Sequence, residues 1–220
     1  MDSALISRIA SVLTTLGTSA PVLRSCLATA KLYEMYIYGL VIRALQTINA
    51  RLTPIDSRSG SSVSSFVFRL GPGYIYSPTT TPCYVLVEYQ SYIYELHNDL
   101  QVVGNSDILH ELDICLLRRE EADSARRARI HPPARSIRLL IECKCYGSSL
   151  QLHLGREFLG LLKDFRVKVR SFVSNISDGS LHTYITHHDA HEDFEVTPLN
   201  QQRETQFINW LADELRQVLA

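Results

Sequence analysis

The sequence predicts an α/β domain in which helices cover a mixed β-sheet, and three observations lead to this prediction. The patterns along the chain follow the order helices, antiparallel strands, central strand, helix, late strand and helix, which is typical of layered α/β domains. Residues 107–117 and 137–146 are mostly apolar at both alternating sets of positions, as in strands that are buried on both faces. Residues 202–219 carry a helical apolar stripe that needs a partner layer.

The composition is that of an ordinary globular protein. The chain has 220 residues, of which 45% are hydrophobic and 20% are charged. This length fits one large domain, which we divide into an N-terminal helical extension (1–22), a core (23–185) and a C-terminal helix (202–219). The net charge of -1 gives no global attraction to nucleic acid, so any such attraction must come from local patches.

The cysteines and the apolar segments predict the cellular compartment of the protein. The five cysteines are odd in number and form no C-x-x-C pair, which favours reduced thiols over a disulfide framework. Cys143 and Cys145 flank Lys144, and we interpret their thiols as small buried hydrophobes and not as metal ligands. No apolar segment reaches the ~20 residues that span a bilayer, and the N-terminus lacks the pattern of a signal peptide. We therefore expect a cytoplasmic protein with no membrane partner.

The chain begins with two helical patterns. Residues 3–16 have helical apolar spacing, and Gly17 and Pro21 then break the chain. A longer helix is predicted over 23–48, and it is apolar on more than one side, as expected of a helix between layers. Glu34 lies inside this apolar run.

A β-rich block follows. Residues 54–65 are rich in Ser and Gly and are predicted to form a loop. Three stretches after it have the alternation or the aromatic and β-branched content of short strands: 65–70, 83–88 and 92–96. Gln90 and Ser91 indicate a hairpin or a bulge between the last two.

The central strand is predicted over 107–117, with Glu111 and Asp113 on one face. The next segment, 118–138, holds seven arginines and three acids, a local balance of +4. Pro132 and Pro133 exclude a continuous helix or inner strand there. We interpret this segment either as a mobile basic loop that contacts a ligand or as a solvated connector.

The second half of the chain alternates between strands and helices. After the strand 137–146, a turn at 147–149 leads into a helix predicted over 150–167, with Ser148 or Ser149 as its N-cap. Residues 170–174 and 183–185 are predicted as one or two late strands.

Asp113, Glu142 and Lys144 form the constellation with the clearest chemistry. Alternation along a strand points Glu142 and Lys144 to the same side, and Asp113 joins them if the two strands are neighbours. Two carboxylates, with a main-chain carbonyl at Cys143, suit Mg²⁺ or Mn²⁺. Such an ion lowers the pKa of a bound water, and Lys144 would position that water or balance the charge of the transition state. The pattern therefore predicts phosphodiester hydrolysis.

These residues resemble the PD-(D/E)xK nuclease superfamily, whose restriction-endonuclease-like fold is a three-layer sandwich with a mixed central sheet flanked by helices. The resemblance rests on Asp113 in E-L-D-I-C-L-L and on Glu142 and Lys144 in L-L-I-E-C-K-C-Y. The order of elements over 23–185 agrees with the core of the family. The chain departs from the family in having Leu112 before the aspartate and in the long gap from Asp113 to Glu142.

The resemblance implies a Mg²⁺-dependent or Mn²⁺-dependent endonuclease that acts on DNA, less often on RNA. It implies a further metal ligand at Glu34 in K-L-Y-E-M-Y, and phosphate contacts at Gln151 and Arg156 in Q-L-H-L-G-R-E-F. We expect additional nucleic-acid contacts from three arginines of the basic segment: Arg126, Arg127 and Arg129. The resemblance is best to a nuclease of a bacterial anti-phage or restriction system, as a homodimer or as part of a multi-subunit complex. The alternative is a catalytically inactive subunit that binds nucleic acid and keeps the fold.

Several other polar residues admit simpler explanations. Glu34 is either a site residue or a helix acid paired with Lys31 or Arg43. Glu111 either lines the cleft or ends in solvent. For Glu95 and His97 we favour an edge-strand polar pair. The histidines in H-H-D-A-H-E lack the spacing of a zinc site, and we interpret them as part of a polar loop: His187, His188 and His191.

Overall fold

The computed structural model describes residues 29–76 and 81–219. Within them, the chain forms a seven-stranded open sheet whose spatial order follows the sequence, from β1 to β7. The first five strands are antiparallel neighbours, whereas β5, β6 and β7 run parallel. The sheet is therefore mixed, as the sequence predicts.

The strands and helices have the following bounds. The strands are β1 (Arg51–Asp56), β2 (Cys83–Tyr89), β3 (Tyr92–Val103), β4 (Leu109–Arg118), β5 (Ile137–Lys144), β6 (Val169–Ser174) and β7 (Glu192–Asp193). The α-helices of the described residues are α3 (Thr29–Thr47), α4 (Arg119–Ala128), α5 (Leu152–Asp164), α6 (Gly179–His187) and α7 (Gln201–Val218), with a short 3₁₀ turn, η1, at Ala134–Ser136.

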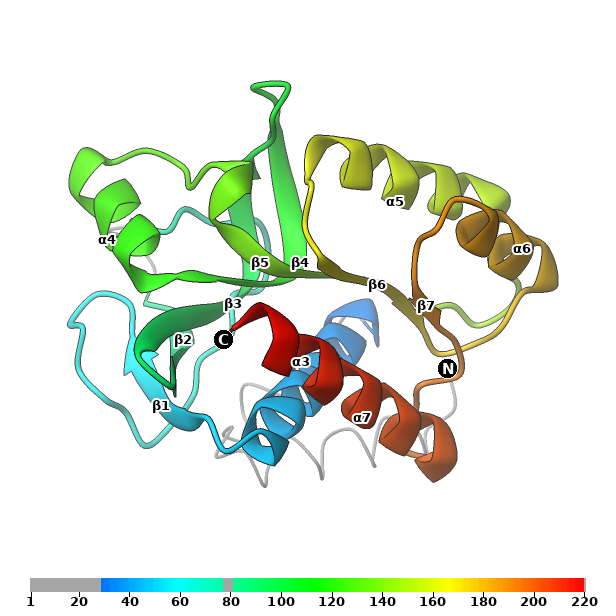
Figure 1. Cartoon of the computed structure of the whole chain (residues 1–220), viewed down its shortest axis with the longest axis horizontal. Coiled ribbons are helices and arrows are strands. Elements are labelled where there is room, and N and C mark those ends of the chain that lie inside the picture. Colours follow the sequence, from blue (N-terminus) through cyan, green and yellow to red (C-terminus); the bar gives the residue numbers. More distant parts are fainter. Residues whose placement is uncertain (1–28, 77–80, 220) are drawn as a thin grey trace.

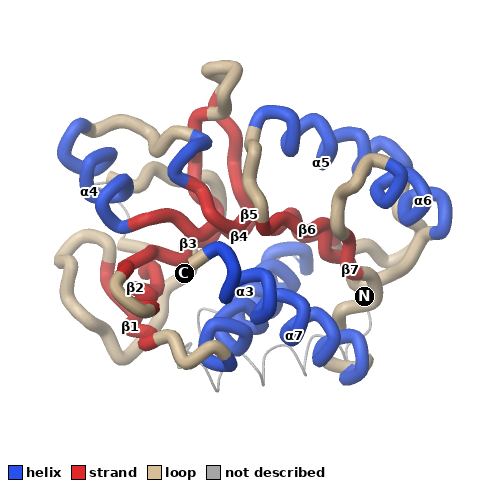
Figure 2. The backbone as a smooth tube through the Cα atoms, viewed as in Figure 1, coloured by secondary structure: helices blue, strands red, loops and turns tan. Residues whose placement is uncertain are grey.

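Helices cover both faces of the sheet. Figure 1 shows α3 and α7 on one side, and α5 and α6 on the other, with α4 beside the antiparallel end. In Figure 2 the strands form one continuous layer between them. Two clusters of buried apolar side chains fill the space, one under α3 and α7 and the other under α4, α5 and α6. No helix of the described part of the chain has the length and apolar character needed to cross a membrane.

Helix α3 is buried along most of its length, which agrees with the apolar pattern on more than one of its sides. The Tyr33 hydroxyl donates to the Val196 carbonyl at 3.0 Å, and the Tyr38 hydroxyl donates to the Leu96 carbonyl at 2.8 Å. These two bonds satisfy phenol groups that would otherwise be buried without a partner. They also fix the helix against β3 and against the segment before α7, and so fix the direction of Glu34.

The antiparallel part of the sheet differs from the prediction in three places. Residues 51–56 form β1, although we predicted a loop from residue 54 onward. Residues 65–70 form no strand; Phe66 and Phe68 are instead buried against α3 in an irregular segment. Strand β3 continues to Val103, well past the predicted end at residue 96.

The segments around β5 and β6 also need correction. Residues 118–138, predicted as a mobile loop, contain the helix α4, which ends before Pro132, and the turn η1. Residues 183–185, predicted as a strand, lie in α6. Helix α5 begins after Gln151, not after Ser148 or Ser149, and no side chain caps it. The helix predicted over 3–16, the N-terminal extension 1–22 and the first residues of the 23–48 helix lie outside the described residues.

Asp164 ties the tip of the β3–β4 hairpin to the end of α5. Its carboxylate accepts hydrogen bonds from the Ser106 amide at 2.7 Å and the Ser106 hydroxyl at 2.6 Å, and it contacts His110 Nε2 at 2.7 Å. A Cβ added to Gly104 would lie 1.9 Å from this carboxylate, so only glycine allows so close an approach.

The two edge strands of the sheet offer few backbone groups for pairing with a further strand. β1 carries Pro54 opposite Val85 of β2, and proline has no N–H to offer a further strand. The Val63 amide donates to the Pro54 carbonyl at 3.0 Å, so the following loop folds over the outer side of β1. At the other edge, β7 has only two residues.

Candidate functional site

The predicted motif lies where two neighbouring strands separate. β4 and β5 are paired as far as Ile114 and Ile141; beyond this pair β4 continues beside β3, and β5 continues beside β6. Asp113 and Glu142 are the first residues beyond the last pair. We call this point the fork. The expectation that the two motif strands are neighbours is confirmed.

Asp113 links the two arms of the fork. Its Oδ2 accepts a hydrogen bond from the Cys143 amide at 2.8 Å. Burial raises the pKa of Asp113 above its ordinary value, although the charge of Lys144 and the Cys143 hydrogen bond oppose the rise. Cys143 was predicted to offer a metal ligand; in the structure its amide orients Asp113, and its thiol is buried in the cluster beneath α3. The thiols of Cys83, Cys115 and Cys145 are also free, as predicted; Cys83 and Cys115 are buried, whereas Cys145, predicted to be buried, is half-buried.

Glu142 and Lys144 form an ion pair on the β5 arm. Lys144 Nζ donates to Glu142 Oε1 at 2.5 Å, and both side chains retain some exposure. Burial, together with the charge of Asp113, raises the pKa of Glu142 to about 7. Burial alone would lower the pKa of Lys144, but the charges of Glu142 and Asp113 outweigh it and raise that pKa. Lys144 therefore stays protonated, as a group that orients water or stabilises negative charge must.

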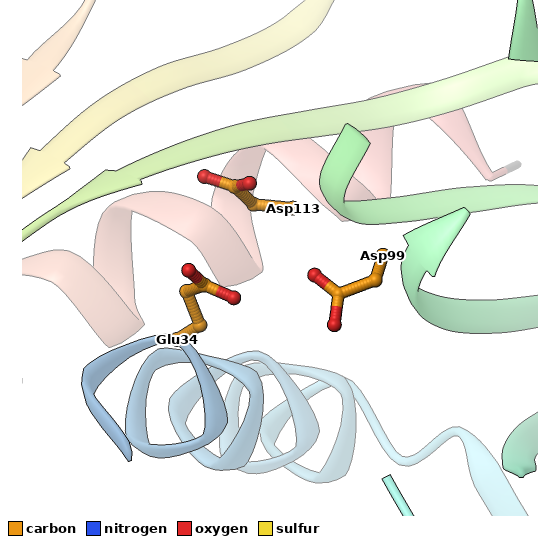
Figure 3. A group of neighbouring side chains, drawn as sticks. All are labelled: Glu34, Asp99 and Asp113. Carbon is orange, nitrogen blue, oxygen red and sulfur yellow. The ribbon is translucent and has the colours of Figure 1, made fainter. Parts of the chain in front are cut away.

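Three carboxylates from three elements meet beside the fork. Glu34 of α3, Asp99 of β3 and Asp113 of β4 have carboxylate oxygens that all lie within 4.8 Å of one another. Figure 3 shows the three side chains directed into the same space. Within residues 29–76 and 81–219, this is the one group of His, Cys, Asp or Glu side chains that is spaced to hold a metal ion. Burial, with the charge of Asp113, raises the pKa of Glu34 to about 8.

Lys31 balances part of this charge. Its ammonium group bonds to Glu34 one turn along α3 and to Asp99 Oδ1 at 2.7 Å. The sequence left two alternatives for Glu34, a pair with Lys31 or a place in the site. In the structure Glu34 has both: it pairs with Lys31 and belongs to the carboxylate cluster. Burial alone would lower the pKa of Lys31, but its bonds to Asp99 and Glu34 raise it.

Asp99 was missed by sequence reasoning because the predicted strand stopped too early. The pairs Asn98–Ile114 and Leu100–Leu112 flank it, which places Asp99 across from Asp113. Its backbone is left-handed, with φ 47°, and its carbonyl accepts from the Gly73 amide at 3.0 Å. Asn and Asp tolerate this conformation better than other non-glycine residues, so the dipeptide Asn-Asp inside an apolar run is the signal that could have located the distortion.

A buried polar network begins on the other side of β3. Glu95 and His97 are fully buried and 2.9 Å apart (Oε2 to Nε2), and the Arg126 guanidinium donates to both Glu95 oxygens. Tyr84 stacks on His97, with ring centroids 5.0 Å apart. The favoured interpretation of Glu95 and His97 as an edge-strand pair is therefore wrong, because β3 is an inner strand and α4 covers them.

The network continues to the carboxylate cluster. Arg69 Nη1 lies 3.3 Å from His97 Nδ1 and donates to the Asn98 carbonyl at 3.1 Å. The Asn98 amide group donates to the Arg69 carbonyl and to Asp99 Oδ2, both at 2.9 Å. Polar contacts thus run without a break from α4 to Asp99. Such a chain restricts the orientation of the Asp99 carboxylate.

The structure places the other predicted nucleic-acid residues on α4 and at the start of α5. Arg127 and Arg129 are exposed at the end of α4. This helix begins six residues after Asp113 along β4, which is about 20 Å at ~3.3 Å per residue of strand. Arg126 is engaged by Glu95 and Asp123. Gln151 and Arg156 are exposed, the first at the N-cap of α5 and the second on its outer surface.

Glu111 and the histidines of the H-H-D-A-H-E segment complete the survey of the predicted residues. Glu111 ends in solvent, although burial and the charge of Asp99 still raise its pKa. His187 and His188 are exposed at the end of α6, and His191 stacks on Trp210 with ring centroids 3.7 Å apart.

Comparison with known proteins gives no family assignment. No protein-family model matches the chain, and no curated protein matches it significantly.

Proposed function

We propose that the protein is a metal-dependent nuclease that hydrolyses phosphodiester bonds of DNA, with the restriction-endonuclease-like three-layer sandwich of the PD-(D/E)xK superfamily. One observation carries the proposal: Asp113, Glu142 and Lys144 converge where β4 and β5 separate. The two further acids beside Asp113 come from other elements: Glu34 from α3 and Asp99 from β3.

The charges at the fork fit a divalent cation. Four carboxylates (Glu34, Asp99, Asp113 and Glu142) and two ammonium groups (Lys31 and Lys144) give a formal balance of −2 when all are ionised. Carboxylate oxygens are the ligands that Mg²⁺ and Mn²⁺ prefer. Burial is the main cause of the raised pKa values of Glu34 and Glu142, and the negative charge of Asp113 adds to it.

The residues at the fork divide the proposed chemistry between them. Asp113 would hold the ion with Glu34 and Asp99, and the Cys143 amide keeps Asp113 in place. Glu142, predicted as a metal ligand, lies outside this group of three carboxylates and pairs with Lys144. The ion would supply Lewis-acid activation of water and of the phosphate. Lys144, which keeps its proton, would orient the attacking water and stabilise the charge that develops on the phosphate.

The biological setting follows from the resemblance of the motif alone. The resemblance of the motif to nucleases of bacterial anti-phage and restriction systems supports a role in defence against foreign DNA. The partners in this proposal are DNA, with RNA as the second substrate class, and either a second copy of the chain or other subunits of a defence complex.

The test is a cleavage assay with linear and circular DNA and with RNA, each with Mg²⁺, Mn²⁺ or EDTA. We expect cleavage with either metal and none with EDTA. Asp113→Asn and Lys144→Ala should each lower the rate at least about 100-fold, because each removes charge stabilisation inside a partly buried site. Glu111→Gln is the matched control, since this acid lies two residues from Asp113 on β4 but points into solvent.

Near-UV circular dichroism and thermal melting must show that the variants are folded. Metal-dependent cleavage that persists in folded Asp113→Asn and Lys144→Ala proteins contradicts the proposal.

One observation favours a second candidate, a catalytically inactive subunit that binds nucleic acid. Lys31 already bonds to Glu34 and Asp99, so a cation must compete with an ammonium group for two of the three carboxylates of the cluster. This candidate predicts salt-sensitive DNA binding without turnover at any divalent ion.

A further inference from the structure

A groove between α5 and α6 is lined by positive charge. It has a volume of about 660 Å³, and Arg156 and Lys163 of α5 and Tyr184 and His188 of α6 stand on its two sides. A second hollow of about 420 Å³ adjoins it and shares two of its residues, Arg166 and Lys168. We call the two together the basic groove. Its cationic residues are Arg135, Arg138, Arg156, Lys163, Arg166, Lys168 and Arg170.

The cations of the basic groove have no acid within ion-pair distance among the described residues. No carboxylate lines either hollow, and within the part of the chain that the structure describes none of the seven cations forms an ion pair. Arg135, Arg156, Lys163, Arg166 and Lys168 are exposed. The Nε of Arg170 is buried without a hydrogen-bond partner among the described residues. Seven unpaired cations in one groove stand out in a chain with a net charge of -1.

The basic groove is separate from the fork. Arg138 and Lys168 lie at the starts of β5 and β6, whereas Glu142 and Lys144 lie at the end of β5. Six residues separate Arg138 from Lys144, which is about 20 Å along a strand. A ligand in the basic groove would therefore lie apart from the carboxylates of the fork.

The distribution of the cations favours an extended ligand over a compact one. Arg156 and Lys163 lie two helical turns apart, about 10 Å along α5, and Arg135 and Arg138 continue the positive surface to the start of β5. A compact polyphosphate needs charges that converge on one point. A nucleic-acid strand needs charges spaced along a track, because its phosphates are spaced along the backbone.

Two rings on the α6 side favour a single strand. The rings of Tyr184 and His188 line the groove, in contact with each other at 5.0 Å between centroids. Proteins that bind single strands without sequence preference combine a cationic track with rings on which bases stack. In a duplex the bases are already stacked on one another and do not reach such rings.

We propose that the basic groove binds the phosphate backbone of a single nucleic-acid strand, with a base against Tyr184. This inference rests on the proposed function for the class of ligand, nucleic acid. It requires neither catalysis nor a metal ion. The ligand would contact the groove and the fork about 20 Å apart, which is the reach of an extended strand of several nucleotides.

The test measures the binding of a labelled single-stranded 20-nucleotide DNA by fluorescence anisotropy in EDTA at several salt concentrations. Arg166→Glu with Lys168→Glu should weaken binding at least tenfold. It should also lower the slope of log affinity against log salt by about 1.4, since two phosphate contacts are lost. Tyr184→Leu should weaken binding of the single strand about fivefold or more and leave duplex binding unchanged.

The matched control is Arg58→Glu with Arg203→Glu, which changes the charge equally at two exposed arginines outside the groove. The inference is overturned if the control weakens binding as much as the groove variant, or if tripolyphosphate binds as tightly as the oligonucleotide. Equal effects of Tyr184→Leu on duplex and single strand also overturn it. All binding is measured in EDTA and needs no cleavage, so this result can be interpreted even if the nuclease test fails.

Discussion

Asp99 combines a left-handed backbone with a fully buried carboxylate in the middle of an inner strand. A non-glycine residue in this conformation costs about 1 kcal/mol or more, and it persists only where surrounding contacts hold it. The Gly73 amide on its carbonyl, and Asn98 and Lys31 on its side chain, are those contacts.

Two substitutions separate the strain at Asp99 from its charge. Asp99→Gly and Asp99→Ala both remove the carboxylate, but only glycine adopts φ 47° without a steric penalty. We expect the Gly variant to be more stable than the Ala variant by about 1 kcal/mol, the reverse of the usual order in a strand. Urea denaturation of both variants measures the difference, and an Ala variant as stable as the Gly variant contradicts this account.

Glu95 should be the most sensitive polar residue of the core. Glu95→Gln leaves Arg126 without its buried counter-charge and should destabilise the protein by about 3 kcal/mol at pH 7. Urea denaturation measures the loss. Glu88→Gln is the matched control, because this acid on β2 is exposed and its pairing with Arg51 is a surface contact worth little.

The contribution of Glu95 should depend on pH in a defined direction. Burial alone would raise the pKa of Glu95, but hydrogen bonds from His97 and Arg126 outweigh it and lower the pKa from 4.5 to about 2. The unfolded chain therefore binds more protons than the folded one between these values, and stability falls as pH drops from about 4.5 to about 2. The difference between wild type and Glu95→Gln should shrink across this range; a constant difference contradicts the assignment.

Sequence reasoning identified single residues well where they share a short motif and poorly where they meet only in the fold. Asp113, Glu142 and Lys144 were named from the periodicity of two strands, which fixes the direction of their side chains. Asp99 and Lys31 reach the same place through the pairing of β3 with β4 and the docking of α3. The register of β3 against β4 and the docking of α3 depend on the packing of the whole core, so no local sequence pattern predicts them.

Helix α5 offers a test of packing at the scale of one element. A Cβ added to Gly155 would lie 2.5 Å from Leu181 Cδ1 of α6, whereas one added to Gly160 would meet no atom within 4 Å. Gly155→Ala should destabilise the protein by about 1–3 kcal/mol, because the buried side chain of Leu181 must shift or α5 and α6 must move apart. Gly160→Ala, on the same helix, should stabilise it by up to about 1 kcal/mol through helix propensity. Thermal melting distinguishes the two, and equal shifts contradict the packing geometry.

Elements were predicted correctly where periodicity was long and regular. The patterns of α7, α5 and β4 extend over ten or more residues each, and the structure confirms all three. The errors fall in short segments. β1 contains a proline that reads as a breaker but is tolerated at an edge, and 65–70 alternates because Phe66 and Phe68 point into the core without joining the sheet. Apolar residues at every second position indicate that one side of a segment is buried, and not that the segment is hydrogen-bonded to a neighbouring strand.

At the scale of the whole molecule, metal binding should stabilise the fold in a manner that depends on pH. The pKa values of about 8 for Glu34 and about 7 for Glu142 lie above the ordinary 4.5, so the folded chain binds more protons than the unfolded chain between these values. The metal-free protein therefore loses stability as pH rises from about 4.5 to about 8. Below this upper limit, protons compete with the cation for the same oxygens.

We therefore expect Mg²⁺ to raise the melting temperature more at pH 8.5 than at pH 6. At 100 times its dissociation constant, a ligand adds about 2.7 kcal/mol, which is about 5–10 °C for a chain of this size. Scanning calorimetry at both pH values measures the effect. Asp113→Asn should abolish it, and Glu111→Gln should preserve it; a shift that is equal at both pH values contradicts a role for Glu34 and Glu142.

The edges of the sheet restrict how copies of this chain assemble. On one side a proline and an overlying loop deny a newcomer the amide donors it needs, and on the other only two residues offer a ladder. Among the described residues, neither boundary invites continuation of the sheet from molecule to molecule. A complex built on the described residues would then be held by side chains on helices and loops, so that single substitutions could change its geometry.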